Sequence, residues 1–345
     1  MYYNWKEQTN TEELKIVCNL IRNGELVIFP TETVYGIGAN ALDPIAVGKI
    51  FIAKGRPSDN PLIVHLADKR KIEEVADDIS EMEQKLIDHF MPGPFTLILK
   101  RKPIIPDIVT AGLDTVAVRI PQNIIAKGII TYAGVPVAAP SANVSGKPSG
   151  TSIDDIRKEL EGKVSAIVDG GETDIGIEST VVKVVNDVPV ILRPGKVTPE
   201  EIKEVAGDVK IDSKVFAKII DDEKIESPGM KYKHYAPETK CKLVSYLNEL
   251  DQIFYLKKLV KEYGENVVII GFKEHQEKIS IPYGEFIALS EKNNLEEYGR
   301  KIFSAIRYAD SLKPNIILIE GVKRQGFGIA IMNRLLRTCE YDIME

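Results

Sequence analysis

Two cations lie two residues apart in the stretch Lys54-Gly55-Arg56, directly before a turn and an apolar run. Pro57 and Pro61 prevent a helix from continuing through this stretch, and the β-branched run that follows predicts a strand. A flexible ammonium beside a planar guanidinium suits an anion such as a triphosphate or a carboxylate. An isolated pair of this kind is more simply a solvated basic turn, so its chemistry depends on what other loops supply.

The densest polar loop runs over residues 140–151, P-S-A-N-V-S-G-K-P-S-G-T, after a strand predicted over 135–139. Its Gly146-Lys147-Pro148 has neither the spacing of a P-loop nor the Ser or Thr that would hold magnesium. Hydroxyls, an amide and backbone N–H groups after a strand nevertheless suit a phosphate or metal-phosphate cradle. A surface turn accounts for the same residue types equally well, and the two interpretations stay open for this loop alone.

A hydroxyl-rich loop over residues 30–41 follows a buried strand predicted over 26–29 and contains Gly36-x-Gly38-x-x-Ala. We reject a dinucleotide-binding site, because six residues separate the strand from Gly36 and because Arg56 occupies the place of an acidic ribose ligand. The sequence instead predicts that these glycines form a tight turn.

A third cation, Arg119, lies in a strand predicted over 115–120. A lone charge in such a strand is more often exposed at a sheet edge than functional. Here its alternation partners Thr115 and Ala117 are small. The pattern therefore leaves room for a ligand beside the guanidinium.

Strand patterns over 179–185 and 188–192 predict a hairpin around an Asn-Asp turn. The first strand begins, and the second ends, at the same end of a hairpin. We therefore expect Ser179 and Arg193 to be neighbours across the ladder, which places a hydroxyl beside a cation.

The chain of 345 residues is 28% charged and 44% hydrophobic, as in an ordinary globular protein that is long enough for two domains. A formal charge of −6 argues against a surface that binds nucleic acid everywhere, although a local basic groove remains possible. Cys18, Cys241 and Cys339 show no disulfide or metal spacing and are interpreted as reduced thiols. No targeting or membrane-spanning segment is recognisable, which predicts a cytoplasmic protein.

Domain boundaries follow from composition. Residues 1–206 form the first predicted domain, and residues 207–240 form a linker. Within the linker, residues 227–237 are bounded by prolines and rich in basic and aromatic residues. We expect this segment to fold over an anionic ligand. A semi-rigid spacer is the alternative for that segment. Residues 241–345 alternate strands with helices and predict a smaller, Rossmann-like parallel α/β domain. No loop of that domain can be assigned chemistry, and its cations are interpreted as solvated: Lys323, Arg324, Arg334 and Arg337.

Taken together, the K-x-R pair, Ser141-x-Asn143, P-T-E-T-V-Y-G at 30–36 and G-I-E-S-T at 176–180 resemble the threonylcarbamoyl-AMP synthase family, with its YrdC-type domain. The resemblance covers the first two hundred or so residues densely, and the linker and tail resemble the longer branch of the family. It implies an α/β fold with an N-terminal twisted, mixed open sheet. It also implies a nucleotidyltransferase that makes threonylcarbamoyl-AMP and pyrophosphate from L-threonine, bicarbonate and ATP, for modification of adenosine 37 in tRNA.

The resemblance assigns residues to two sides of one site. Lys54 and Arg56 are the expected catalytic cations. The residues implied on the ATP side are Arg56, Asn60, Thr115, Ser141, Asn143, Ser149, Arg193 and one of the linker tyrosines, Tyr232 or Tyr235. Those implied on the L-threonine side are Thr33, His65, Arg119, Ala139 and Ser179. A satisfied core histidine is the alternative for His65.

Mg²⁺ is the implied cofactor, held by phosphates and water with Ser141 as a possible ligand, since no carboxylate cluster marks a metal site made by the protein. The implied partners are the three substrates, a hand-off to the tRNA threonylcarbamoyl transferase machinery and at most weak tRNA contact. One alternative is a regulatory RNA-binding module with a basic groove and no adenylate synthesis. The other is an ATP-using carbamoyl transferase that acts on carbamoyl phosphate, although the chain lacks the zinc-finger or hydrolase segments expected of one.

Overall fold

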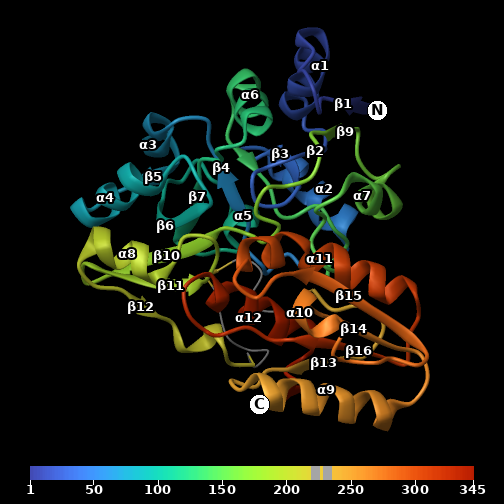
Figure 1. Ribbon diagram of the computed structural model, residues 1–345. Helices are drawn as coiled ribbons and strands as arrows, with labels where there is room; N and C mark the ends of the chain where they lie inside the picture. The colour runs from blue at the N-terminus through green and yellow to red at the C-terminus, as the bar shows by residue number, and fades with distance from the viewer. Residues whose placement is uncertain (219–225, 228–234) are drawn as a thin grey trace. The chain divides into compact units, whose positions relative to one another are not determined.

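The computed structural model describes residues 1–218, 226–227 and 235–345, and its chain divides into two compact units (Figure 1). The first comprises residues 1–145 and 149–232, and the second residues 146–148 and 233–345. The predicted α/β fold class with two sheets is confirmed. None of the helices that the structure describes is both long and apolar enough to cross a membrane.

The first unit is built on one mixed sheet of 12 strands, in the order β1-β9-β2-β3-β8-β4-β7-β6-β10-β11-β12, with β5 paired to β6. Parallel and antiparallel neighbours alternate irregularly along it, which confirms the mixed sheet that the family resemblance implied. Its strands are β1 (Tyr2–Asn4), β2 (Val27–Phe29), β3 (Gly36–Asn40), β4 (Ile63–His65), β5 (Ala76–Asp77), β6 (Phe95–Arg101), β7 (Thr115–Arg119), β8 (Val137–Ala138), β9 (Ala166–Asp169), β10 (Thr180–Val185), β11 (Val188–Arg193) and β12 (Lys210–Ile211).

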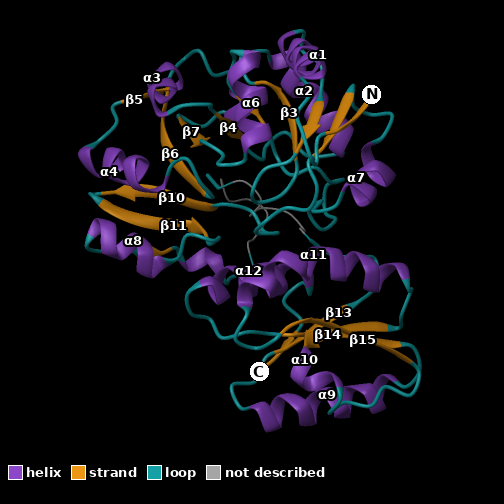
Figure 2. Cartoon of the chain, turned by 45° about the horizontal axis from the view of Figure 1, so that its top comes forward, coloured by secondary structure: helices purple, strands orange, loops and turns teal. Residues whose placement is uncertain are grey.

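Helices pack on both faces of this sheet. They are α1 (Thr11–Arg22), α2 (Pro44–Lys54), α3 (Ile72–Val75), α4 (Glu81–Phe90), α5 (Asp107–Thr110), α6 (Ile124–Ala133), α7 (Ile153–Leu160) and α8 (Pro199–Ala206). Strand β2 shows how alternation divides the core: Val27 and Phe29 pack with α1 and α6, whereas Ile28 packs in the cluster that contains α2. Helices α1 and α6 lie side by side in both ribbon views (Figures 1 and 2).

The predicted tight turn at Gly36 and Gly38 is wrong, because both glycines lie inside strand β3. At Gly38 the absence of a side chain permits close packing. A Cβ atom on Gly38 would lie 2.5 Å from the Phe29 ring and 2.9 Å from a Val137 methyl group. Only a residue without a side chain lets these neighbours approach the strand.

Replacing Gly38 by alanine is expected to lower the free energy of unfolding by about 1–3 kcal/mol, because the buried ring and methyl group must move. Gly128 in α6 is the matched control, since nothing lies within 4 Å of its Cβ position. Gly128→Ala should instead stabilise the protein by about 0.5–1 kcal/mol. Urea unfolding of both variants measures the difference, and a neutral Gly38→Ala would contradict the packing argument.

The second unit holds a parallel five-stranded sheet in the order β15-β14-β16-β13-β17, as predicted for a Rossmann-like domain. Helices α9 and α10 cover one face and α11 and α12 the other (Figure 2). Its elements are β13 (Cys241–Val244), α9 (Glu249–Tyr263), β14 (Val267–Phe272), α10 (Lys273–Gln276), β15 (Gly284–Ser290), α11 (Leu295–Ser311), β16 (Ile316–Glu320), α12 (Phe327–Thr338) and β17 (Ile343–Met344).

The interpretation of Arg334 and Arg337 as solvated charges is wrong, because their exposed fractions are 0% and 6%. The Arg334 guanidinium lies over the ring of Tyr235, 5.7 Å from its centroid, and donates to Asn333 Oδ1 at 2.7 Å. The same tyrosine stacks on Phe303 of α11, with ring centroids 5.0 Å apart. Contacts between distant segments thus bury what the local sequence presents as a charged helix.

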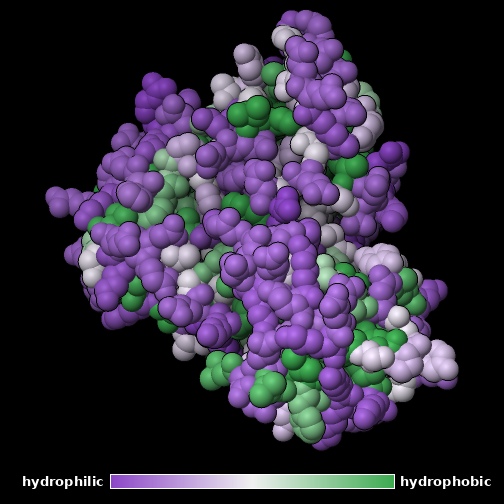
Figure 3. Space-filling view, viewed as in Figure 1, coloured by the Kyte–Doolittle hydropathy of each residue, from purple (hydrophilic) through white to green (hydrophobic). Residues whose placement is uncertain are grey.

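Side chains at the surface are mostly hydrophilic on the face that Figure 3 shows, with apolar residues in scattered patches. Lys323 and Arg324 are exposed, as predicted. Cys18, Cys241 and Cys339 are buried free thiols.

Candidate active site

The register of four neighbouring strands places predicted site residues in one row across the first sheet. His65 in β4 pairs with Arg119 in β7, and Arg119 pairs with Thr96 in β6. Thr96 pairs with Val181 in β10, two residues after Ser179. Because registered residues point to the same face, the sheet presents an imidazole, a guanidinium and two hydroxyls side by side.

A second row on the same face is apolar. Ile63, Ala117 and Ile98 are in register and form a buried cluster with Val181 and Leu192. The core of this cluster contains strand residues only. This face of the sheet therefore offers a polar row that suits charged groups of a ligand. The apolar surface beside it suits a flat or aliphatic group of a ligand.

Arg119 is held by three hydrogen bonds. It donates to Thr33 Oγ1 at 2.8 Å, to Glu32 Oε1 at 2.7 Å and to the carbonyl of Gly93 at 3.3 Å. Burial raises the pKa of the Glu32 carboxyl, but the Arg119 guanidinium and backbone hydrogen bonds outweigh it, so the pKa lies below its ordinary value. Glu32 is thus an ionised partner of Arg119.

The hydroxyl-rich loop after β2 is ordered by Thr31. Its hydroxyl donates to the carbonyl of Val34 at 2.6 Å and accepts the N–H groups of Thr33 and Val34 at 3.2 and 3.3 Å. This turn aims Thr33 at Arg119. Ala139, also predicted on the threonine side, donates its N–H to the carbonyl of Ile63 at 3.0 Å and therefore adjoins the apolar row.

His65 is fully enclosed, and burial followed by the nearby Arg119 charge lowers its pKa to about 3. The imidazole is therefore neutral in the folded protein near pH 7. Its Nδ1 lies 3.2 Å from the carbonyl of Ile63.

The neutral histidine predicts a pH-dependent stability. The pKa of His65 falls from 6.5 to about 3 on folding, so the unfolded chain binds a proton that the folded chain does not. Stability is full above pH 6.5 and decreases as the pH falls toward 3, by about 2 kcal/mol between pH 7.5 and 5. Urea unfolding across this range should show that slope, and His65→Gln should remove it.

The exposed His89 in α4 is the matched control for this experiment. His89→Gln should retain the wild-type dependence on pH. A wild-type slope that survives in His65→Gln would contradict the assignment to His65.

Among the residues predicted for the ATP side, Lys54 organises the Ser141-x-Asn143 loop. Its ammonium donates to the carbonyl of Ser141, to that of Asn143 at 2.6 Å and to Asn143 Oδ1 at 3.5 Å. The Ser141 hydroxyl in turn donates to Asn143 Oδ1 at 2.6 Å. Helix α2 ends at Lys54 because Gly55 adopts the left-handed conformation with φ +61°.

Arg193 and Ser179 are neighbours, which confirms the expectation from the hairpin. Arg193 Nε and Nη2 donate to the Ser179 carbonyl at 3.1 and 3.0 Å, and Nη2 lies 3.1 Å from Ser179 Oγ. Ser179 Oγ is 2.7 Å from Thr96 Oγ1. Hydroxyls therefore connect the Arg193 region to the row that contains Arg119.

The remaining residues predicted for the ATP side occupy three positions. Arg56 donates to the carbonyls of Asn60 and Pro61 at 3.4 and 3.1 Å, just before β4. Thr115 begins β7, about 13 Å along the strand from Arg119, so the structure separates it from the polar row. The hydroxyl of Ser149 donates to the Glu178 carboxylate. Tyr232 lies outside the described residues, as does most of the segment 227–237.

Sequence reasoning missed three buried residues near these groups: Thr96, Glu32 and Glu178. Thr96 could have been identified as a site residue because its hydroxyl is the polar exception in the apolar strand predicted over 95–99. The two glutamates lie inside motifs that were recognised, but their partners are distant in the sequence.

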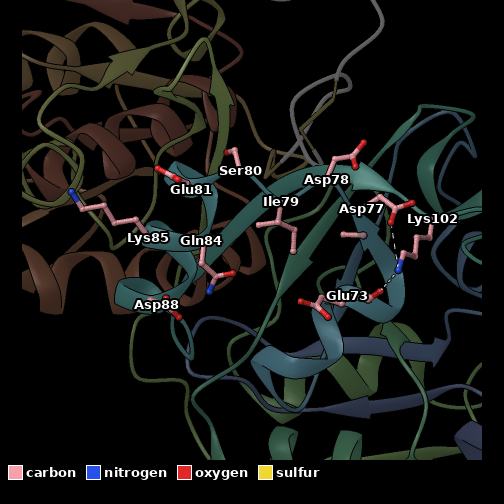
Figure 4. Close-up of a pocket in the computed structure, with 11 residues that line it drawn as sticks. Glu73, Asp77, Asp78, Ile79, Ser80, Glu81, Gln84, Lys85, Asp88 and Lys102 are labelled. Atoms are coloured by element: carbon pink, nitrogen blue, oxygen red, sulfur yellow. Dashed lines mark hydrogen bonds and ion pairs between the residues drawn. The ribbon is translucent and has the colours of Figure 1, made fainter.

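A separate cavity of about 740 Å³ lies among α3, β5 and α4 (Figure 4). Five carboxylate residues and two lysines line it, and Lys102 reaches Asp77 at 3.5 Å. None of its lining residues was predicted for the site. An acidic lining disfavours a polyphosphate, so we do not place ATP there.

Two family profiles match the chain. The family described as "Telomere recombination", which groups Sua5, YciO and YrdC proteins, matches residues 19–195. The "Threonylcarbamoyl-AMP synthase, C-terminal domain" family matches residues 197–339. The chain belongs to the threonylcarbamoyl-AMP synthase family. The resemblance inferred from the motifs is thereby confirmed.

Curated relatives in the threonylcarbamoyl-AMP synthase family match over nearly the whole chain. The threonylcarbamoyl-AMP synthase of Pyrococcus abyssi is 43% identical, covering 99% of this chain and 98% of its own. That of Bacillus subtilis is 41% identical, covering 95% and 93%. The crystal structure of P. abyssi Sua5 complexed with L-threonine superposes with a TM-score of 0.93 and 42% identity, covering 100% of this chain and 99% of that one.

The described residues contain no group of three or more His, Cys, Asp or Glu side chains able to hold a metal ion such as Mg²⁺. The two carboxylates beside the predicted residues are already engaged, Glu32 by Arg119 and Glu178 by Ser149. The donor set fits an ion held mainly by phosphate and water.

Proposed function

We propose that this chain is a nucleotidyltransferase that makes threonylcarbamoyl-AMP from L-threonine, bicarbonate and ATP. The observation that carries the proposal is the row of His65, Arg119 and Thr96 on one sheet face, beside an apolar surface and next to Arg193. Membership of the threonylcarbamoyl-AMP synthase family and the threonine complex of P. abyssi Sua5 support it.

The reaction has two bond-forming steps. The threonine nitrogen attacks the bicarbonate carbon, and a carbamate forms as water and a proton leave. A carbamate oxygen then attacks the α-phosphorus, and the bond to the bridging oxygen of the β-phosphate breaks, which releases pyrophosphate. Neither step requires a covalent enzyme intermediate, so we assign catalysis to positioning and charge neutralisation.

On the threonine side, Arg119 is proposed to bind the carboxylate, since a guanidinium matches its geometry. Thr33 and Ser179 supply hydroxyls for the substrate hydroxyl or carboxylate. Because His65 is neutral, it offers a hydrogen bond without adding charge. Ala139 contributes little volume and leaves space for the ligand.

On the nucleotide side, Lys54 and Arg56 are proposed to neutralise the phosphates during transfer, Lys54 also by shaping the loop that it holds. The other proposed ATP contacts are Asn60, Thr115, Ser141, Asn143, Ser149, Arg193 and a linker tyrosine, Tyr232 or Tyr235. Mg²⁺ would enter with ATP, with the Ser141 oxygen as its proposed protein ligand, and would neutralise phosphate charge. We further propose a cytoplasmic location and transfer of the product to tRNA threonylcarbamoyl transferases.

Pyrophosphate release tests the proposal directly. With ATP, magnesium and bicarbonate, release should require L-threonine. Valine should react at least about 100-fold more slowly, because a site that hydrogen-bonds the substrate hydroxyl leaves polar groups unpaired when that hydroxyl is absent. Serine tests the contribution of the methyl group. No release with any amino acid, from protein that still binds ATP, would favour the RNA-binding alternative.

A further inference from the structure

We infer that Glu32 is a positioning residue, which holds Arg119 in the orientation that binds the carboxylate of the amino-acid substrate. The inference rests on the proposed function and adds to it a residue from the middle of the P-T-E-T-V-Y-G motif. Glu32 acts on Arg119 and is not assigned a contact with the substrate.

The Glu32 carboxylate joins two elements. Oε1 accepts from Arg119 Nη2 at 2.7 Å, and Oε2 accepts the backbone N–H of Asn123 at 3.2 Å. Asn123 caps α6, where its side chain accepts the N–H groups of Ile125 and Ala126. The acid therefore ties the end of β7 to the first turn of α6 and leaves Arg119 little freedom to rotate.

The donors of Arg119 are only partly used. A guanidinium side chain carries five N–H groups, and Arg119 makes three hydrogen bonds, to Glu32, Thr33 and Gly93. Within the described part of the chain two N–H groups thus remain for a ligand. A carboxylate has two oxygens that accept such bonds.

Charge leads to the same assignment. Glu32 and Arg119 are 6% and 4% exposed and together carry no net charge. A buried guanidinium without a counter-ion would be costly. A neutral ion pair that retains unused hydrogen-bond donors suits a zwitterion such as an amino acid. The carboxylate of the zwitterion binds the guanidinium, and the zwitterion as a whole adds no net charge to the buried site.

A purely structural role for Glu32 makes a different prediction. If the acid only stabilises the loop and α6, its loss should lower stability and weaken every substrate alike. If it positions Arg119, its loss should weaken threonine selectively and should have no further effect once Arg119 is absent. A double-mutant cycle separates the two cases.

The experiment measures L-threonine binding by calorimetry and threonine-dependent pyrophosphate release on the full chain. Glu32→Ala should weaken threonine binding and raise its KM by about 10-fold or more, with KM for ATP changed less than about 2-fold. Glu32→Gln, which keeps an oxygen for Arg119, should have a smaller effect. In an Arg119→Ala background, Glu32→Ala should add less than about 2-fold to the loss of threonine affinity.

Asp169→Asn is the matched control, because Asp169 is a buried carboxylate that pairs with Tyr2 and Lys6. It should leave threonine affinity unchanged. Thermal unfolding checks that each variant folds, and Glu32→Gln keeps the test decisive if Glu32→Ala does not. Additive effects in the cycle, or equal losses for threonine and ATP, would overturn the inference. Threonine binding without pyrophosphate release in the wild type would instead refute the proposed reaction.

Discussion

Replacing Lys54 by alanine is expected to lower kcat/KM for threonine-dependent pyrophosphate release by about 100-fold or more, the range seen when a buried donor is removed from an active site. Lys54 is 2% exposed, and its ammonium donates to the carbonyls of Ser141 and Asn143 and to the Asn143 side chain. Its loss leaves buried acceptors unsatisfied, each costing about 1–3 kcal/mol, and releases the loop proposed to bind ATP. The assay is pyrophosphate release with saturating bicarbonate and varied ATP.

Lys49 provides the matched control because it lies on the same helix, five residues earlier. Its side chain is 39% exposed and pairs with Glu25 at 2.8 Å, a contact of the kind that contributes little. Lys49→Ala should retain wild-type turnover within about 2-fold. If the Lys54→Ala variant folds and releases pyrophosphate at the wild-type rate, the loop does not depend on this cation. Lys54 would then not be a catalytic residue.

The K-x-R motif shows which parts of the site the sequence could predict. Pro57 and Pro61 predict that no helix continues through the motif, and the structure ends helix α2 at Lys54, just before them. Local rules suffice because a helix end is set by its own few residues. The partners of the ammonium lie about ninety residues away, and no local pattern indicates them.

Residues on the sheet face show what an alternating sequence pattern can predict and what it cannot. The pattern Thr115, Ala117, Arg119 correctly predicted that small residues share a face with the guanidinium. It could not predict that Arg119 is in register with both His65 and Thr96, because register depends on pairing between strands that are distant in the sequence. The Glu32–Arg119 pair was missed for the same reason.

The glycines of β3 and the arginines of α12 show two ways in which tertiary packing overrides local preference. Gly36 and Gly38 occur in a composition typical of turns, yet both lie within a strand, and the close approach of Phe29 and Val137 requires a residue without a side chain at Gly38. Arg334 and Arg337 have the composition of a solvated helix face, yet Tyr235 lies against the Arg334 guanidinium. In both cases the contacting residue that determines the local structure is distant in the sequence, so a short stretch of sequence does not reveal it.

The planar guanidinium of Arg193 places two donors on one carbonyl, that of Ser179. Arg193→Lys keeps the charge but cannot reproduce the bonds from Nε and Nη2 to the Ser179 carbonyl. Ser179 also loses the Nη2 contact at its hydroxyl and retains Thr96 at 2.7 Å. Because Ser179 is proposed on the threonine side and Arg193 on the ATP side, one substitution should affect both substrates.

We expect Arg193→Lys to lower kcat/KM by about 10–100-fold, as for loss of a charged hydrogen-bond pair at a binding site. KM should rise for ATP and for threonine. Arg101→Lys is the control, since Arg101 also donates to a backbone carbonyl, that of Ile105 at 3.0 Å, but at the far end of β6. A change confined to ATP would show that the hydroxyls of Ser179 and Thr96 do not link the two sides, and the threonine role of Ser179 would then lose its support.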